Sequence, residues 1–600
     1  MRCLSIEQLH HAYGEGLAPE KVVDEVFDAI EAAGDPGIFI SMVKQTAARR
    51  AALALGPFDP VARPLWGVPF AVKDNIDVNG METTAACPAF AYTAKASATV
   101  VQLLIDAGAI LIGKTNLDQF ATGLVGVRTP YPVPRNAIDP ELVPGGSSSG
   151  SAVAVARGLV SFALGTDTAG SGRVPAALNN IVGLKPSLGL VSTRGVLPAC
   201  RTLDCVSIFG LTVDDAWRAL GVIACFDEAD AYSRAMRLGA MAMPASLRIA
   251  VPDGGSLEHF GDGNAAAAWS SSLDDLTSMG YAVEKVSLDA FRAAAELLYA
   301  GPWVAERYAA IRDFIESDAR ALYPVTRKII TAARKYSAAD AFAGQYRLAA
   351  LKREAAAIWR DFDVLVVPSI PTVYTRADLQ ADPITPNSRL GTYTNFVNLL
   401  DLCALAVPGR FRRDGRPASV TLIAPAGGDG LLAALGARLH ARANPGLGAM
   451  SWEVPPPKVS QSVGPEGCIE IVLVGAHMSG MALNPEVTAL GGTFVRAART
   501  LDCYRLFALP GGPPARPGLL RTGNAKGLPI DVEVWALPPE GFARFVAAIP
   551  APLGIGTLLL DDGTQSKGFL VESEGVADAR DISSFGGWRA YIASLVARRA

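Results

Sequence analysis

The short apolar runs in the first 450 residues constrain the fold more than any other feature of this sequence. Runs of strand length lie at 66–72, 109–113, 162–165, 247–252 and 363–371, and Ala-rich stretches with helical character lie between them. Such runs are typical of strands that are buried in a sheet with both faces covered. Their alternation with helices predicts an α/β core, which two or three amphipathic helices in the first 50 residues precede.

Composition narrows the class of protein and its compartment. With 600 residues, of which 50% are hydrophobic and 19% charged, the chain is long and apolar enough for a packed globular protein of two domains. The net charge of −4 is spread without long like-charged runs, so we expect neither a nucleic acid nor a membrane as partner. The eight cysteines form no CxxC pair and the start lacks an apolar leader segment, which favours a reduced, cytoplasmic protein without a metal site.

A domain boundary is expected in segment 451–467. This segment contains three consecutive prolines and many polar residues, follows a predicted helix at 431–443 and precedes a new apolar strand. We therefore predict a large domain over 1–450, a Pro-rich linker over 451–467 and a smaller α/β domain over 468–600.

Two short motifs match the sequence patterns of known functional sites, but the residues around them do not predict the local structure that those sites need. Residues 108–115 fit the phosphate-binding loop expression, but the residues between the two glycines form an apolar strand instead of an exposed loop. Residues 146–150 fit the GxSxG elbow of other hydrolases, but a proline-broken loop precedes them where that device needs a strand. Neither match predicts function.

A serine-rich constellation offers better chemistry. The segment PGGSSSGSAVAVA (144–156) is followed by FALGTDTAGSGRVPAA (162–177), in which a buried strand leads into a turn that presents Ser171. The N–H groups of the small-residue turn before Ser171 could bind an oxyanion. None of the five histidines lies between residues 12 and 258, so lysine is the alternative base. Lys73 ends an apolar run, where burial would lower its pKa and yield a neutral amine.

These segments, together with WGVPFAVKDNID, GAILIGKTNLDQFATG and GLKPSLGLVS, resemble the amidase signature family. The resemblance implies a mixed β-sheet that helices cover on both faces, and a triad of base, relay and nucleophile. The matching residues are Lys73 as base, Ser147 as a relay in a cis peptide, and Ser171 as nucleophile. It also implies an oxyanion hole at Thr168, Ala169 and Gly170. Ser149 and Ala169 stand where the family usually has Gly, and Asp167 with Arg173 resembles a structural ion pair.

Four further segments are RGVLPACRTLDCVSIFGLT, LYAGPWVAERYAAI, PVTRKII and PNSRLGTYTNFVNLLDLCALAVP. They resemble the allophanate hydrolases, a group within this family that degrades urea. This resemblance implies hydrolysis of allophanate, a small anion, to ammonia and carbon dioxide without a cofactor. It implies substrate contacts from Tyr299, Arg307 and the backbone of Gly123, and the guanidinium fork of an arginine suits a carboxylate. Gly301-Pro302 interrupts the helix between Tyr299 and Arg307, so the sequence does not place them on one face. A homodimer is also expected.

The C-terminal part contains VGAHMSGMALN (474–484), CYRLFALPGG (503–512) and a KGF triplet at 567–569. Through these segments it resembles the second domain of these enzymes, which has a gamma-glutamyl cyclotransferase-like fold and is linked to decarboxylation of N-carboxycarbamate. His477, the one histidine of residues 468–600, is either structural or an acid–base group there. The alternatives are an amidase of other specificity, including an amidotransferase subunit that acts on tRNA, and a C-terminal domain that only docks a urea carboxylase. The sequence has no biotinyl-lysine MKM motif, so we expect any coupled urea carboxylase to be a separate chain.

Overall fold

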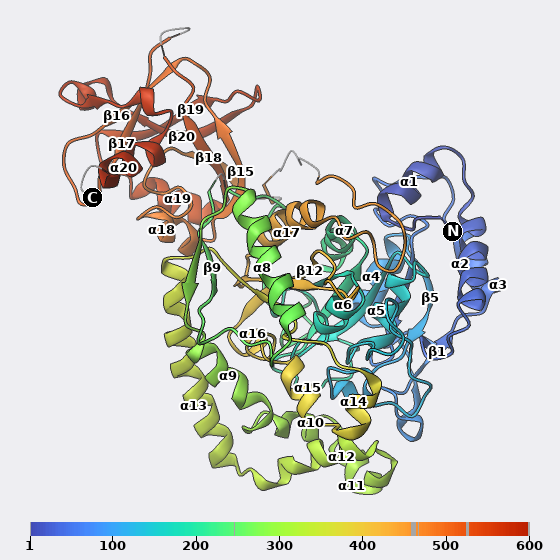
Figure 1. Ribbon diagram of the computed structural model, residues 1–600. Helices are drawn as coiled ribbons and strands as arrows, with labels where there is room; N and C mark the ends of the chain where they lie inside the picture. The colour runs from blue at the N-terminus through green and yellow to red at the C-terminus, as the bar shows by residue number, and fades with distance from the viewer. Residues whose placement is uncertain (1, 245, 458–463, 466, 524–526, 598–600) are drawn as a thin grey trace. The chain divides into compact units, whose positions relative to one another are not determined.

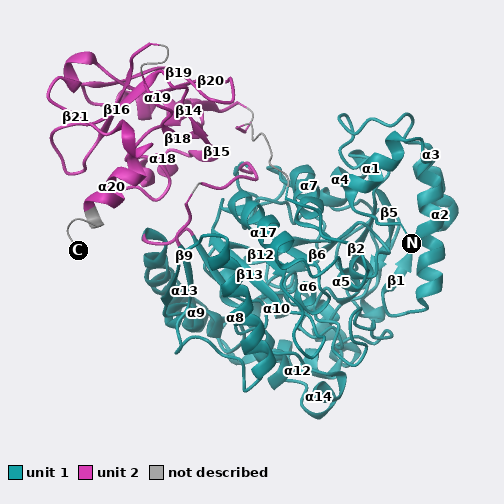
Figure 2. Ribbon diagram, turned by 45° about the horizontal axis from the view of Figure 1, so that its top comes forward, with its two compact units in different colours: residues 1–237, 249–360, 364–457 teal, residues 238–248, 361–363, 458–600 magenta. Residues whose placement is uncertain are grey.

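The structure is a computed structural model, and it describes residues 2–244, 246–457, 464–465, 467–523 and 527–597. The chain divides into two compact units (Figure 2). Unit 1 consists of residues 1–237, 249–360 and 364–457, and unit 2 of residues 238–248, 361–363 and 458–600. Residues 458–463 and 466 of the expected linker lie outside the described residues.

Unit 1 is built on a large mixed sheet. Within the described residues the sheet has eleven strands in the order β1-β5-β2-β6-β8-β7-β12-β13-β11-β9-β10. The strands are β1 (Phe39–Met42), β2 (Pro69–Lys73), β5 (Ile110–Thr115), β6 (Phe162–Asp167), β7 (Val182–Lys185), β8 (Cys205–Gly210), β9 (Ile249–Pro252), β10 (Val283–Val286), β11 (Val364–Pro368), β12 (Leu402–Pro408) and β13 (Ser419–Pro425). β2 runs parallel to β5 and β6, whereas β6 and β8 are antiparallel.

The five apolar runs of the sequence correspond to β2, β5, β6, β9 and β11, so the predicted α/β core is confirmed. Residues 110–115 form strand β5, which confirms that the phosphate-loop pattern at 108–115 is accidental. A separate hairpin pairs β3 (Glu82–Thr83) with β4 (Tyr92–Thr93).

Helices cover both faces of the sheet (Figure 1). They are α1 (Ile6–Gly14), α2 (Pro19–Ala33), α3 (Gln45–Leu53), α4 (Thr99–Asp106), α5 (Ser149–Ala156), α6 (Val174–Leu178), α7 (Val213–Ile223), α8 (Gly263–Ser278), α9 (Asp289–Tyr299), α10 (Val304–Ala310), α11 (Arg312–Asp318), α12 (Pro324–Thr331), α13 (Ala338–Ala355), α14 (Arg376–Ala381), α15 (Thr385–Leu390), α16 (Phe396–Leu399) and α17 (Asp429–Ala443). Helices α1, α2 and α3 confirm the two or three amphipathic helices expected in the first 50 residues. Every residue of α5 is buried, because its side chains are no larger than valine and let it pack closely against β2 and β6.

The order of the strands brings the serine-rich segments to Lys73. β2 and β6 are parallel neighbours, with Val72 opposite Leu164, so their carboxyl ends lie at the same edge of the sheet. Lys73 is the last residue of β2, and the turn that contains Ser171 follows β6. Residues distant in the sequence therefore meet at this edge.

Unit 2 has sheets of its own. A five-stranded sheet has the order β15-β18-β14-β20-β19, and a three-stranded sheet has the order β17-β16-β21. Their bounds are β14 (Ile469–Leu473), β15 (Thr493–Arg499), β16 (Tyr504–Ala508), β17 (Pro517–Arg521), β18 (Asp531–Leu537), β19 (Leu553–Leu559), β20 (Gln565–Val571) and β21 (Arg580–Asp581). The helices are α18 (Asn484–Ala489), α19 (Pro539–Ala547) and α20 (Trp588–Ala597). In the described part of the chain, no helix combines the length and hydropathy that a membrane crossing needs.

Candidate active site

Lys73 is fully buried at the carboxyl end of β2. Its Nζ donates hydrogen bonds to Ser147 Oγ and to Thr166 Oγ1, each over 2.7 Å. The structure thus brings the expected base and the expected relay serine into contact. Thr166 was not singled out from the sequence, although it lies in the same GTDTAGSG motif as Ser171.

The electrostatic surroundings of Lys73 favour the neutral amine. Burial lowers the pKa of Lys73 from 10.5 to about 7, because the ammonium loses its hydration. Three buried carboxylates oppose this shift by stabilising the cation, namely Asp118, Asp204 and Asp167. At neutral pH an appreciable fraction of the side chain can therefore accept a proton.

Ser147 is held by the neighbouring Asp118. The Gly146–Ser147 peptide is cis, and Ser147 O accepts a hydrogen bond from Asp118 N. The Asp118 carboxylate accepts the backbone N–H groups of Val125, Gly126 and Arg128. A Cβ at Gly146 would lie 2.1 Å from Asp118 Oδ2, so only glycine fits before the relay serine.

Ser171 lies in the turn after β6 and is 3% exposed. Its Oγ donates a long hydrogen bond of 3.5 Å to Gly123 O. Among the described residues it forms no hydrogen bond with Ser147 or Lys73, so the structure joins the expected relay serine to the base but not to the expected nucleophile. Catalytic hydrogen bonds are often long before substrate binds.

The turn between Thr168 and Ser171 is braced by the expected ion pair. Arg173 donates to both carboxylate oxygens of Asp167 over 2.8 and 3.0 Å, and both side chains are fully buried. Asp167 Oδ1 also accepts the N–H of Gly170 over 2.8 Å. The Gly170 N–H is thus occupied, whereas those of Thr168, Ala169 and Ser171 form no hydrogen bond with any described residue.

Two further contacts fix this turn. Gly170 has a φ of 132°, and a Cβ there would lie 2.3 Å from Thr394 Oγ1, so the position requires glycine. The Thr168 hydroxyl donates to the buried carboxylate of Asp204 over 2.5 Å. Asp204 was not predicted as a site residue, because nothing in the sequence signals this contact between two loops.

Tyr299 and Arg307 come together even though Gly301-Pro302 separates their helices. Arg307 Nη2 donates to Tyr299 Oη over 3.2 Å, and the guanidinium carbon lies 5.2 Å from the ring centroid. Arg307 Nη1 donates to Ala121 O and Thr122 Oγ1. The side chain is 2% exposed, and its Nε has no hydrogen-bond partner among the described residues.

The segment that carries Ala121 connects Arg307 to Ser171. Phe120 and Ala121 have φ values of 51° and 52°, a left-handed conformation that costs non-glycine residues about 1–3 kcal/mol each. Gly123, two residues later, provides the carbonyl that accepts from Ser171. A strained segment thus lies between the buried guanidinium and the candidate nucleophile.

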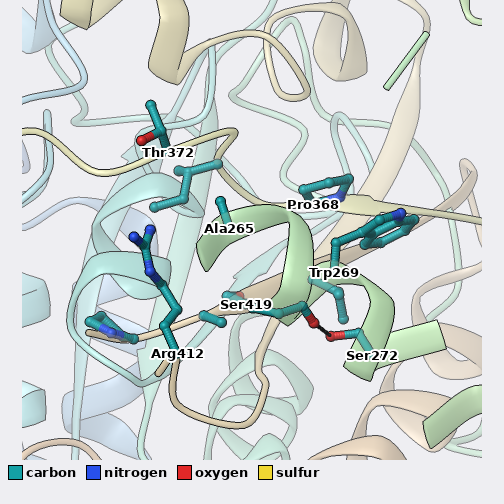
Figure 3. Close-up of a pocket in the computed structure, with 12 residues that line it drawn as sticks. Ala265, Trp269, Ser272, Pro368, Thr372, Arg412 and Ser419 are labelled. Atoms are coloured by element: carbon teal, nitrogen blue, oxygen red, sulfur yellow. Dashed lines mark hydrogen bonds between the residues drawn. The ribbon is translucent and has the colours of Figure 1, made fainter. Parts of the chain in front are cut away.

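Two cavities in unit 1 differ greatly in size. The one in Figure 3, lined by Trp269, Arg412 and Ser419 among others, has a volume of about 30 Å³ and has room for about one water molecule. A second, of about 630 Å³, is lined by Trp303, Glu306 and Asp204 among others. This larger cavity therefore reaches the carboxylate that holds Thr168.

His477 lies in unit 2, in the loop that follows β14, four residues after the strand ends at Leu473. Its ring stacks on Phe569, with centroids 5.5 Å apart, and contacts the edge of Phe545. Nε2 lies 3.3 Å from Glu486 Oε2, and burial lowers the pKa of the imidazole. These contacts are compatible with both expected roles, structural and acid–base. The described residues contain no cluster of three or more His, Cys, Asp or Glu side chains that could hold a metal ion.

The family is established by comparison with known proteins. Residues 21–433 match the model of the amidase family, and residues 469–593 match the model described as the allophanate hydrolase C-terminal domain. The chain therefore belongs to the amidase family.

Individual relatives extend the likeness over both units. An allophanate hydrolase structure from Kluyveromyces lactis is 38% identical, with a TM-score of 0.78, over 98% of this chain and 99% of that one. The urea amidolyases of Saccharomyces cerevisiae and Lachancea kluyveri are 40% and 43% identical over 98% and 88% of this chain. The chain spans about a third of the length of these two relatives, 33% and 30% respectively.

Proposed function

We propose that this chain hydrolyses allophanate by covalent catalysis through Ser171, Ser147 and Lys73. The observation that carries the choice of substrate is Arg307, a buried guanidinium that bonds Ala121 and Thr122, just before the Gly123 carbonyl that accepts from Ser171. Its Nε has no hydrogen-bond partner among the described residues. A buried cation of this kind is stabilised by an anion that accepts its free N–H. Allophanate has a carboxylate at one end and a carbamoyl group at the other, so it can pair with Arg307 and present its amide to Ser171. Tyr299 holds the guanidinium in place.

The proton transfers begin at the lysine. Neutral Lys73 takes the proton of Ser147, which takes the proton of Ser171, and the Ser171 Oγ attacks the terminal carbamoyl carbon. This relay requires the Ser171 hydroxyl to turn from Gly123 O towards Ser147. The C–N bond of the carbamoyl group then breaks, ammonia leaves with the transferred proton, and water hydrolyses the acyl-enzyme to N-carboxycarbamate.

The oxyanion of the tetrahedral intermediate requires free N–H donors. Thr168, Ala169 and Ser171 have such groups. Gly170, which the resemblance included in the oxyanion hole, acts in this proposal through its backbone conformation, because its N–H already donates to Asp167.

Unit 2 is proposed to assist decarboxylation of N-carboxycarbamate, with His477 as its candidate acid–base group. The match of residues 469–593 to the allophanate hydrolase C-terminal domain supports a role in the same pathway. The names of the urea amidolyase relatives support functional coupling to a urea carboxylase. The homodimer remains a prediction from the resemblance, and the cytoplasmic location a prediction from the scattered cysteines.

The test is turnover of a matched series of amides by the full chain. We expect ammonia release from allophanate and malonamate, which have a carboxylate, and little from biuret or acetamide. Arg307→Gln should raise KM for the two anions and leave the slow turnover of neutral amides unchanged. Equal turnover of charged and neutral amides by the unaltered chain would instead indicate an amidase of other specificity.

The nucleophile is tested separately. Ser171→Ala should abolish ammonia release from allophanate. Ser149→Ala is the matched control, because Ser149 is also buried and, among the described residues, its hydroxyl forms one hydrogen bond, to Asn116 O. Retained activity in Ser171→Ala, or equal loss in both variants, contradicts the assignment.

A further inference from the structure

The buried arginines of unit 1 fall into two kinds. Within the described residues, four arginines of this unit are less than a tenth exposed: Arg128, Arg173, Arg307 and Arg412. Arg173 bonds both oxygens of Asp167, and Arg412 pairs with Asp262 and Asp414. Buried guanidinium groups are normally compensated in this way by carboxylates.

Arg128 and Arg307 lack such partners. Arg128 donates to the backbone carbonyls of Thr122 and Pro383, and Arg307 to the groups of Ala121, Thr122 and Tyr299 described above. Neither guanidinium forms an ion pair with a carboxylate within the described residues. Both also have an Nε without a hydrogen-bond partner.

The two arginines without an ion-pair partner contact the same residue, Thr122. Arg128 Nη1 donates to Thr122 O over 3.0 Å, and Arg307 Nη1 donates to Thr122 Oγ1 over 3.1 Å. A Cβ at the next residue, Gly123, would lie 3.2 Å from Arg128 Cδ, and Gly123 O is the group that accepts from Ser171. Two cations therefore flank the segment that touches the candidate nucleophile.

Asp118 does not neutralise the Arg128 guanidinium through a direct bond. Its carboxylate accepts the backbone N–H groups of Val125, Gly126 and Arg128, and none of its hydrogen bonds comes from an arginine side chain. The charge of Asp118 stabilises the Arg128 cation and so opposes the effect of burial, which lowers the pKa of Arg128.

We propose that Arg128 is a second anion-binding residue of the active site, and that the pair of arginines selects small 1,3-dicarboxylates. This inference rests on the proposed function, which supplies the chemical reason for a second charge. Allophanate has one carboxylate, whereas hydrolysis of its acyl-enzyme forms N-carboxycarbamate, which has two. Arg307 binds the carboxylate present from the start, and Arg128 binds the charge that develops at the carbamoyl end. Malonate, with a methylene in place of the NH, is the stable isostere of this product.

The experiment is calorimetric titration of the full-length Ser171→Ala chain with malonate and with its monoamide, malonamate, at pH 8. We expect malonate to bind at least tenfold more tightly. Arg128→Gln should reduce that preference at least tenfold, and Arg128→Lys should restore part of it because the charge is kept. Arg307→Gln should weaken both ligands. Arg412→Gln, which removes a buried arginine that carboxylates already compensate, should leave the preference unchanged.

Two results would overturn the proposal. One is equal affinity for malonate and malonamate in the Ser171→Ala chain with both arginines intact, which decides the question even where the Arg128 variants do not fold. The other is an unchanged preference in a folded Arg128→Gln chain. Because titration needs no turnover, failure of the proposed function appears separately, as a lack of ammonia release from allophanate by the unaltered chain.

Discussion

The pH dependence of ammonia release follows directly from the burial of Lys73. Burial lowers the pKa of this lysine to about 7, so raising the pH from 6 to 8 should increase its neutral fraction from about 9% to about 91%. If the neutral amine is the base, kcat should rise about tenfold over this interval and then level off. A solvated lysine with a pKa near 10.4 would be less than about 1% neutral at pH 8 and would give a rate that still rises steeply there.

The assay is ammonia release from saturating allophanate between pH 6 and 9.5, corrected for breakdown of allophanate without enzyme. Lys73→Arg provides the matched perturbation, because arginine keeps the cation but does not lose its proton in this range. Loss of general base catalysis should lower kcat by about 10²- to 10⁴-fold at every pH. A flat profile for the unaltered chain, or an Arg variant that retains the same profile, would refute lysine as the base.

Three further predictions concern other residues. Gly170→Ala should lower kcat by at least about 100-fold, because a Cβ would lie 2.3 Å from Thr394 Oγ1 and displace the oxyanion turn; near-normal kcat would show that the turn tolerates a shift. Asp204→Asn should move the rise in kcat to lower pH, because this carboxylate raises the pKa of Lys73; an unchanged profile would mean that Asp204 carries no charge that Lys73 senses. His477→Asn should keep ammonia release from the first step but slow the release of carbon dioxide, and equal rates for both products would assign His477 a structural role.

The fold was largely predictable because its strands are short, apolar and separated by turn-forming residues. The run 162–165 became β6, and the small-residue helix after the serine run became α5. The break between two helices was also predictable, because Gly301-Pro302 interrupts the helical pattern and the structure separates α9 from α10 there. Local sequence carries such signals, since backbone preferences and apolar periodicity act over a few residues.

Contacts between loops were not predictable from residue patterns. Asp204 meets Thr168 from the loop before β8, and Arg128 shares Thr122 with an arginine nearly 200 residues away in the sequence. Such pairs depend on how strands order themselves in the sheet, and single-sequence periodicity does not encode that order. The hydrogen bond of the Gly170 N–H was likewise not predictable, because it depends on the orientation of the Asp167 side chain that accepts it.

The most direct test of the central claim is the pH dependence of covalent labelling by a fluorophosphonate, with the modified residue identified by peptide mass spectrometry. The account predicts an adduct on Ser171, formed at a rate that rises through pH 7 in the unaltered chain and falls by orders of magnitude in Lys73→Met. An adduct on another serine, or labelling of Ser171 at the same rate with and without the amine, would contradict it.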